Sequence, residues 1–240
     1  MEIKLDILAF AAHPDDVELA ASGTMIKHVQ MGKKTGIIDL TQGEMGTRGN
    51  AEIRGEESNL ASEILGVSVR ENLGFADAFF EVSNENLLKI IQKLRKYRPN
   101  VVLCNAVSDR HPDHARASEL VSRACFMSGL KKIKTFDNDK EQDYFRPVAV
   151  YHYIQDRWID PDFIVDITDT YDLKVEAIKC FKSQFFNPDS KEPETPISTD
   201  HFLKSIESRA ISLGRYIDTE YGEGFTSERF IGINDLTNLL

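Results

Sequence analysis

The sequence predicts an α/β protein with a doubly wound, Rossmann-like and mostly parallel sheet that carries helices on both faces. Two observations predict this fold. Short apolar runs alternate with stretches of helical periodicity through the first half of the 240 residues. The run 5–12 is almost wholly apolar, which is typical of a strand buried on both of its faces.

Each predicted strand is a short run rich in branched or other apolar residues, bounded by charged or turn residues. The predicted strands are 5–12, 36–41, 67–73, 101–105, 148–154 and 163–167. In a doubly wound sheet of order 3-2-1-4-5, the first and fourth strands are neighbours. We therefore expect the active site at the C-terminal ends of strands 1 and 4.

The predicted helices show apolar residues at three- and four-residue spacing, and several end at a glycine or proline. They are 17–31, 51–65, 84–97, 113–127, 173–185 and 202–217. Segment 187–199 holds three prolines and few apolar residues, so we expect a surface loop near the site. Because no segment resembles a linker, we expect residues 1–240 to form a single domain.

The charge balance restricts the partners. The chain has 29 basic and 39 acidic residues and a net charge of −10, whereas binding to nucleic acid or anionic membranes requires a positive surface. The first residues alternate charged and apolar side chains, unlike a signal peptide. The three cysteines are widely separated, as in a reducing compartment. We expect a cytoplasmic protein that acts on a small molecule.

Two short motifs share the tripeptide His-Pro-Asp. The motif HPDD occupies 13–16, directly after the first strand, and HPDH occupies 111–114, after the fourth. Since those strand ends are expected to be neighbours, both motifs should lie in one crevice. Proline and acidic residues at a helix start could by themselves serve as caps, but capping does not explain three histidines in one crevice.

The residue types favour a catalytic zinc site, which has three nitrogen or oxygen ligands and an open position for water. His13, Asp16 and His114 supply such a set. Asp15, beside a ligand, is suited to act as general base on the water. Iron or cobalt could replace zinc in a His2Asp set, so Fe²⁺ remains an alternative.

The second motif adds an acid–base group to this set. His111 with Asp113 has the composition of an imidazole oriented by a carboxylate, able to stabilise an oxyanion or protonate a leaving amine. Together these residues predict metal-assisted hydrolysis, most naturally of an amide.

The sequence resembles the PIG-L/LmbE-like zinc-dependent deacetylases, which remove acetyl from N-acetylglucosamine conjugates. The resemblance is carried by AHPDDVE at 12–18 and HPDH at 111–114. It extends to 43–49, 51–57, 72–74, 163–168, 183–185 and 221–225. Within the family, the segment 109–114 is most similar to the deacetylases of bacillithiol biosynthesis, which act on N-acetylglucosaminyl-L-malate.

The resemblance implies roles residue by residue. It implies zinc binding by His13, Asp16 and His114, a base at Asp15, and assistance from His111 with Asp113. It further implies that Arg54 contacts the sugar, that Arg110 lies near the acidic end of the conjugate, and that the protein is a homo-oligomer such as a hexamer. Asp109 stands where some relatives have a tyrosine, so no tyrosine contribution is expected.

Three hypotheses remain open for the function and its substrate. Arg48, Arg54 and Arg110 fall in or near loops that follow strands 2 and 4, which favours a small anionic sugar conjugate such as the malate conjugate. A related deacetylase could instead act on a chitobiose unit or an antibiotic intermediate. A non-catalytic metal-binding module is a third reading, although it would not need Asp15 as a spare carboxylate.

Overall fold

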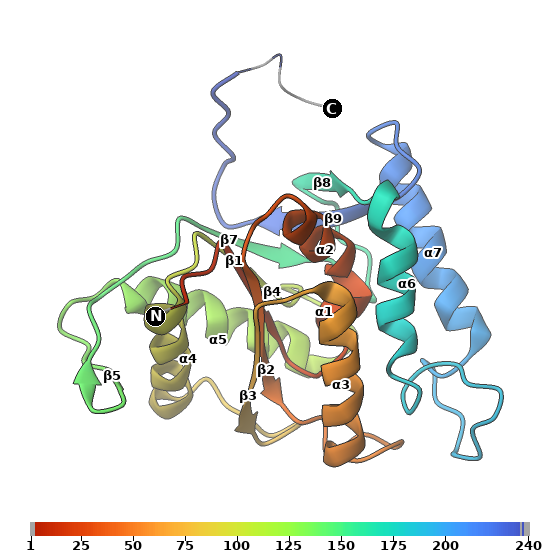
Figure 1. The fold of residues 1–240 in the computed structure, drawn as a ribbon, viewed down its shortest axis with the longest axis horizontal. Helices are drawn as coiled ribbons and strands as arrows, with labels where there is room; N and C mark the ends of the chain where they lie inside the picture. Colours follow the sequence, from red (N-terminus) through yellow and green to blue (C-terminus); the bar gives the residue numbers. More distant parts are fainter. Residues whose placement is uncertain (1–2, 236, 238–240) are drawn as a thin grey trace.

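The computed structural model describes residues 3–235 and 237, and its centre is a seven-stranded sheet of order β3-β2-β1-β4-β7-β9-β8 (Figure 1). The strands of this sheet are β1 Ile7–Ala11, β2 Thr35–Thr41, β3 Val69–Phe75, β4 Val101–Cys104, β7 Ala149–Tyr153, β8 Phe163–Asp166 and β9 Gly222–Ser227. The first five strands in this order, which are β3, β2, β1, β4 and β7, pair in parallel. They follow the predicted order 3-2-1-4-5. Strand β9 is antiparallel to both β7 and β8. The predicted fold class is confirmed.

Helices cover both faces of the sheet. The helices are α1 Asp16–Ala20, α2 Ser22–Gln30, α3 Ala51–Leu65, α4 Asn84–Tyr97, α5 Pro112–Ser128, η1 Thr168–Thr170, α6 Tyr171–Lys179 and α7 Asp200–Arg215. A small hairpin joins β5 Phe136–Asp137 to β6 Lys140–Glu141. Among the described residues, no helix combines the length and apolar character needed to cross a membrane.

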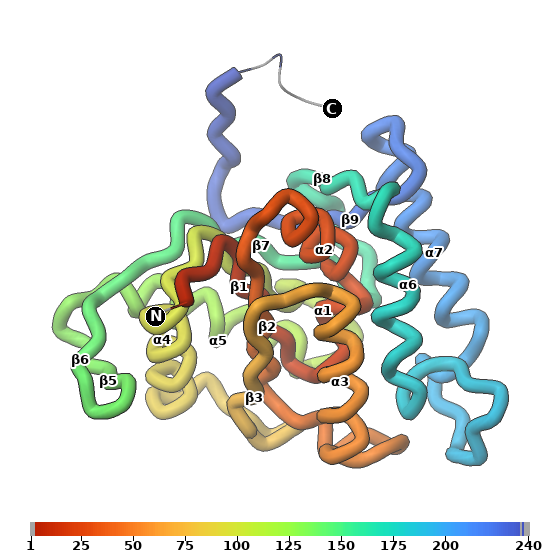
Figure 2. Tube along the Cα trace, viewed as in Figure 1, coloured from red at the N-terminus to blue at the C-terminus, as the bar shows by residue number. Residues whose placement is uncertain are grey.

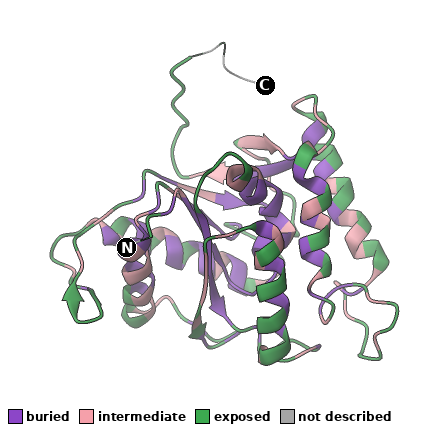
Figure 3. Cartoon of the chain, viewed as in Figure 1, coloured by how far each residue is buried: buried purple, intermediate pink, exposed green. Residues whose placement is uncertain are grey.

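Strand β1 shows why its sequence is apolar throughout. Leu8 and Phe10 pack with α4 and α5 on one face, and Ile7 and Ala9 pack with α1, α2, α3 and α6 on the other. All five residues of β1 are buried, and Figure 3 shows the sheet as the buried centre between outward-facing exposed helix surfaces. Burial on both faces explains why period-two alternation is missing from this strand.

The expected helix 17–31 is wrong in one respect, because the structure divides it into α1 and α2. The break is at Ala21, whose backbone leaves the helical region at φ −143° and ψ 5°. The Glu223 carboxylate accepts hydrogen bonds from the backbone N–H groups of Gly23 at 3.0 Å and Thr24 at 2.7 Å. These N–H groups belong to the first turn of α2, so a carboxylate distant in sequence caps a new helix there.

The C-terminal half differs further from the prediction. Strand β9 was not predicted, yet it inserts between β7 and β8, where the chain returns to the sheet (Figure 2). The expected helix 173–185 begins earlier and ends earlier, as α6 at Tyr171–Lys179. Helix α7 is close to the predicted 202–217, and the Thr199 hydroxyl caps its first turn by accepting from the Phe202 N–H.

Candidate active site

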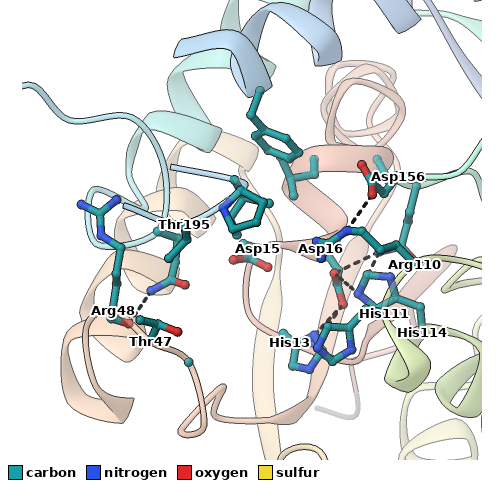
Figure 4. A pocket seen from close by; sticks show the side chains of 18 of the residues that line it. His13, Asp15, Asp16, Thr47, Arg48, Arg110, His111, His114, Asp156 and Thr195 are labelled. Atoms are coloured by element: carbon teal, nitrogen blue, oxygen red, sulfur yellow. Dashed lines mark hydrogen bonds and ion pairs between the residues drawn. The ribbon is translucent and has the colours of Figure 1, made fainter. Parts of the chain in front are cut away.

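A pocket of about 340 Å³ opens where β1 and β4 end, and it holds most of the predicted site residues (Figure 4). The predicted residues among its lining are His13, Asp15, Asp16, Arg54, Arg110, His111 and His114. The motif HPDD links β1 to α1, and HPDH begins α5 shortly after β4. The crevice at the strand order reversal therefore holds both motifs, as the sequence predicted.

The three motif histidines form one cluster. The ring centroids of His13 and His111 are 4.7 Å apart, those of His111 and His114 are 5.2 Å apart, and those of His13 and His114 are 5.6 Å apart. Among the described residues, this trio is a group whose ligand atoms lie close enough together to hold one metal ion. Asp16 adjoins it, because its Oδ1 is 3.0 Å from Nε2 of His114.

Two residues that sequence reasoning missed hold the Asp16 carboxylate. Asn105, at the end of β4, donates from its side chain to Oδ2 of Asp16 at 2.9 Å. Gln155 donates from Nε2 to Oδ1 of Asp16 at 3.0 Å. The backbone N–H of His13 also donates to Oδ2, at 2.9 Å. Side-chain amides after β4 and β7 thus orient a carboxylate at the end of β1, as outer partners do around metal ligands.

Carboxylates also contact two of the three histidines. Nε2 of His13 lies 3.1 Å from Oδ1 of Asp77 and 3.4 Å from Oδ2 of Asp113, and these three residues form a second group able to hold a metal ion. Nδ1 of His114 lies 2.5 Å from Oδ2 of Asp109. Asp109 therefore has a partner within the site, while Asp77 was not anticipated because no motif surrounds it.

The structure places Asp113 differently from its expected role beside His111. Its carboxylate accepts from the backbone N–H of Ala78 at 3.0 Å and pairs with Arg116 at 2.6 Å, besides facing His13. Among the described residues, the contact between Asp113 and His111 runs through the Asp113 backbone N–H, which donates to Nδ1 of His111 at 3.2 Å. The reason is local, since this bond caps the first turn of α5.

The electrostatics of the cluster favour a cation. Burial lowers the pKa of His13, but hydrogen bonds with Asp113, Asp16 and Asp77 outweigh it and raise the pKa well above its ordinary value. The pKa of His114 rises to about 9, because Asp16 and Asp109 outweigh its burial. Imidazoles that retain protons so strongly lie in a negative field, and nitrogen and oxygen donors of this kind suit zinc or iron. The residues present fit a divalent metal ion.

Asp15 lies beside the cluster in a constrained conformation. Its backbone φ of 127° is in a region that residues other than glycine rarely adopt. Its carboxylate pairs with the guanidinium of Arg54 at 2.8 Å, and both side chains are buried. Burial raises the pKa of Asp15 to about 7, although the charge of Arg54 opposes the rise. A carboxylate with a pKa near neutrality can exchange protons efficiently in neutral water.

The two predicted substrate arginines have different surroundings. Arg54 is almost fully buried and, besides Asp15, donates to the backbone carbonyls of Pro14 and Gly43. Arg110 lies at the pocket mouth, where its Nε donates to Asp156 at 2.8 Å (Figure 4). Arg54 thus orients Asp15 from within the wall, and Arg110 is exposed beside a carboxylate.

Comparisons with known proteins identify relatives of this chain. The family model described as PIG-L, GlcNAc-PI de-N-acetylase, matches residues 8–125, which include both His-Pro-Asp motifs. The diacetylchitobiose deacetylase of Thermococcus kodakarensis is 31% identical over 190 residues, covering 75% of this chain and 70% of that protein. A Bacillus anthracis protein named "Probable N-acetyl-alpha-D-glucosaminyl L-malate deacetylase 2" is 26% identical over 201 residues, covering 77% and 84%.

The fold has a counterpart among solved structures. The crystal structure of a conserved protein from Thermus thermophilus superposes with a TM-score of 0.84 and 35% sequence identity, covering 96% of this chain and 98% of that one. The agreement therefore extends from the motif-bearing first half through the C-terminal strands. Because sequence identity, motifs and fold agree over most of its length, this chain belongs to the PIG-L family of deacetylases.

Proposed function

We propose that the protein is a divalent-metal-dependent N-deacetylase that removes the acetyl group of an N-acetylglucosaminyl conjugate. One observation carries the proposal, namely the buried Asp15 carboxylate beside the His/Asp cluster on the pocket wall. A purely structural metal site is closed by its own ligands and requires no further carboxylate with a pKa near 7. Catalysis is therefore favoured over a stabilising metal module.

His13, Asp16 and His114 are the residues that would hold the metal. Zinc is proposed, with Fe²⁺ as the alternative that the same donors accept. When bound, such an ion polarises a carbonyl oxygen and lowers the pKa of a coordinated water. Asn105 and Gln155 keep the Asp16 carboxylate in place, at 2.9 and 3.0 Å.

The remaining groups of the site would move protons. Asp15, held by Arg54 at 2.8 Å, accepts a proton from the attacking water. Burial lowers the pKa of His111 below its ordinary value, so its ring is mostly neutral at pH 7. Its Nδ1 accepts from the Asp113 N–H, so the neutral ring carries its proton on Nε2 and can donate a hydrogen bond to the developing oxyanion. Asp15 can then pass the proton taken from the water to the leaving amine.

For the substrate itself we propose N-acetylglucosaminyl-L-malate. The similarity to the Bacillus anthracis protein and the arginines around the pocket support an anionic conjugate. Diacetylchitobiose is the second candidate, because the similarity to the Thermococcus enzyme is higher, at 31% identity. The two substrates differ in charge at the group attached to the first sugar, and this difference makes them separable by experiment.

The test is acetate release from a panel of N-acetylglucosaminides by the protein loaded with Zn²⁺ or Fe²⁺. We expect hydrolysis that a chelator abolishes and metal restores, with the malate conjugate preferred. Asp15→Asn is the control, because it retains the metal ligands and removes the base. Full activity in protein shown by elemental analysis to lack metal would contradict metal dependence. If no substrate released acetate, the proposed deacetylase activity would be wrong.

A further inference from the structure

Four arginines line the pocket, and they differ in how their charge is balanced. Three of them pair with a carboxylate. These pairs are Arg48–Glu192, Arg54–Asp15 and Arg110–Asp156, at 3.4, 2.8 and 2.8 Å. The fourth, Arg209, has no carboxylate within ion-pairing distance among residues 3–235 and 237. The pocket wall therefore holds one guanidinium whose charge lacks a direct partner.

The contacts of Arg209 leave most of its donors available. Within the part of the chain that the structure describes, one of its five N–H groups is engaged, where Nη2 donates to the Asp156 carbonyl at 2.8 Å. The Asp156 carboxylate is taken up by Arg110 instead. Arg209 is half-buried, and an incompletely paired cation in such a place favours an incoming anion.

On α7, two apolar residues line the pocket beside Arg209. Phe202, Ile206 and Arg209 all line the pocket, at spacings of four and three residues, which places them on one side of the helix. Two apolar side chains thus precede the cation along this side. Such a stripe suits a ligand that has an apolar surface, such as the face of a sugar ring, next to an anionic group.

We propose that Arg209 is the specificity-determining residue that binds the anionic oxygens, of a carboxylate or a phosphate, on the aglycone of the substrate. The proposal rests on the proposed deacetylase function. A guanidinium can present two parallel N–H groups to either anion. In this arrangement the Asp156 carboxylate is paired with Arg110 and only partly offsets the charge of Arg209.

The test compares acetate release from three substrates that share the sugar. N-acetylglucosaminyl-L-malate carries carboxylates, N-acetylglucosamine 1-phosphate carries a phosphate, and methyl N-acetylglucosaminide is neutral. For Arg209→Gln we expect the ratio of kcat/KM for the preferred anionic substrate to that for the neutral one to fall about ten-fold or more, mainly through KM. Arg209→Lys should restore part of the ratio. If the malate conjugate is preferred, the site recognises a carboxylate, and if the 1-phosphate is preferred, it recognises a phosphate.

Two further variants make the test sharper. Arg215→Gln is a matched control on the same helix, because Arg215 is 81% exposed, pairs with Asp218 and lies outside the pocket lining. It should keep the wild-type ratio. Asp156→Asn removes the carboxylate that faces the two arginines, so we expect the ratio to rise. A fall in the ratio for Asp156→Asn would contradict the proposal.

The outcomes separate the two levels of inference. If no substrate releases acetate, the proposed function is wrong and this inference falls with it. If acetate is released but Arg209→Gln keeps the wild-type ratio, the inference alone is overturned. Equal turnover of all three substrates by the wild-type protein would overturn it in the same way.

Discussion

Asn105 donates a side-chain N–H to Oδ2 of Asp16 at 2.9 Å, and this bond joins the C-terminal ends of β4 and β1. The other end of the amide is also engaged, because Oδ1 of Asn105 accepts from the backbone N–H of Ala12 at 2.9 Å. Asn105 is fully buried. A buried amide fixed at both ends can hold the carboxylate of Asp16, a proposed metal ligand, in one orientation before any metal binds.

Asn105→Ala should therefore weaken metal binding by about 10- to 100-fold, the usual effect of losing an outer partner of a ligand. Competition with a chromophoric chelator measures the dissociation constant. Asn59→Ala, on the exposed side of α3, is the matched control. Urea unfolding of the metal-free variant checks that it folds. Unchanged affinity in a folded Asn105→Ala protein would exclude this role.

The adjacent carboxylates Asp15 and Asp16 should give different defects. Asp15→Asn should retain the metal and lose about 10²- to 10⁴-fold in kcat, because it removes the proposed general base. Asparagine suits the test because it has nearly the same shape as aspartate, which limits any change at a backbone position whose φ is 127°. Elemental analysis and single-substrate kinetics are the measurements.

Asp16→Ala, in contrast, should lower metal occupancy, because it removes a proposed ligand. Its defect should be partly reversed by a higher metal concentration, whereas that of Asp15→Asn should not. Equal metal loss in both variants, or normal turnover by Asp15→Asn, would show that the two roles are assigned wrongly.

The sequence allowed the motif residues to be placed because their information is local. HPDD follows β1 closely and HPDH comes a short loop after β4, and a parallel sheet brings those strand ends together. Asn105, Gln155 and Asp77 could not be found in this way, since each is a single common residue in a loop whose partner is distant in sequence. Glu18 ends the motif at 12–18 but does not line the pocket, because its side chain is fully buried and pairs with Arg70.

Strand β9 was missed for a related reason. Gly222 and Gly224 lower its intrinsic strand propensity, while its pairing with β7 and β8 supplies the missing stability. The division of α1 from α2 depends on Glu223 of this same strand. Both features come from tertiary contacts between distant segments, which local patterns do not record.

The stability of the metal-free protein should fall as pH rises from about 6 to 8.5. The pKa of His114 is raised from 6.5 to about 9 in the folded protein. A raised histidine pKa contributes stability that is fully present below the unfolded value and is lost as pH rises through the folded value. Thermal unfolding in the presence of a chelator measures this slope.

A divalent metal should reverse that trend, because it binds the deprotonated imidazole that alkaline pH provides. The increase in Tm on adding Zn²⁺ should therefore be larger at pH 8.5 than at pH 6. His114→Gln should reduce the slope of the metal-free protein. A Tm of the chelated wild-type protein that does not change between pH 6 and 8.5 would contradict this assignment of proton and metal competition.

The buried pair of Lys174 and Glu223 should contribute strongly to the free energy of unfolding. Nζ of Lys174 lies 2.6 Å from Oε1 of Glu223, and both side chains are only 3% exposed. Glu223→Gln would leave the ammonium group without its counter-charge and weaken the cap on α2, so we expect a loss of about 3–5 kcal/mol in the free energy of unfolding. Glu85→Gln, which breaks the exposed pair with Lys89, should cost less than about 1 kcal/mol. Urea denaturation of the two variants measures both losses in the free energy of unfolding. Equal losses would show that the buried pair contributes no more than an exposed one.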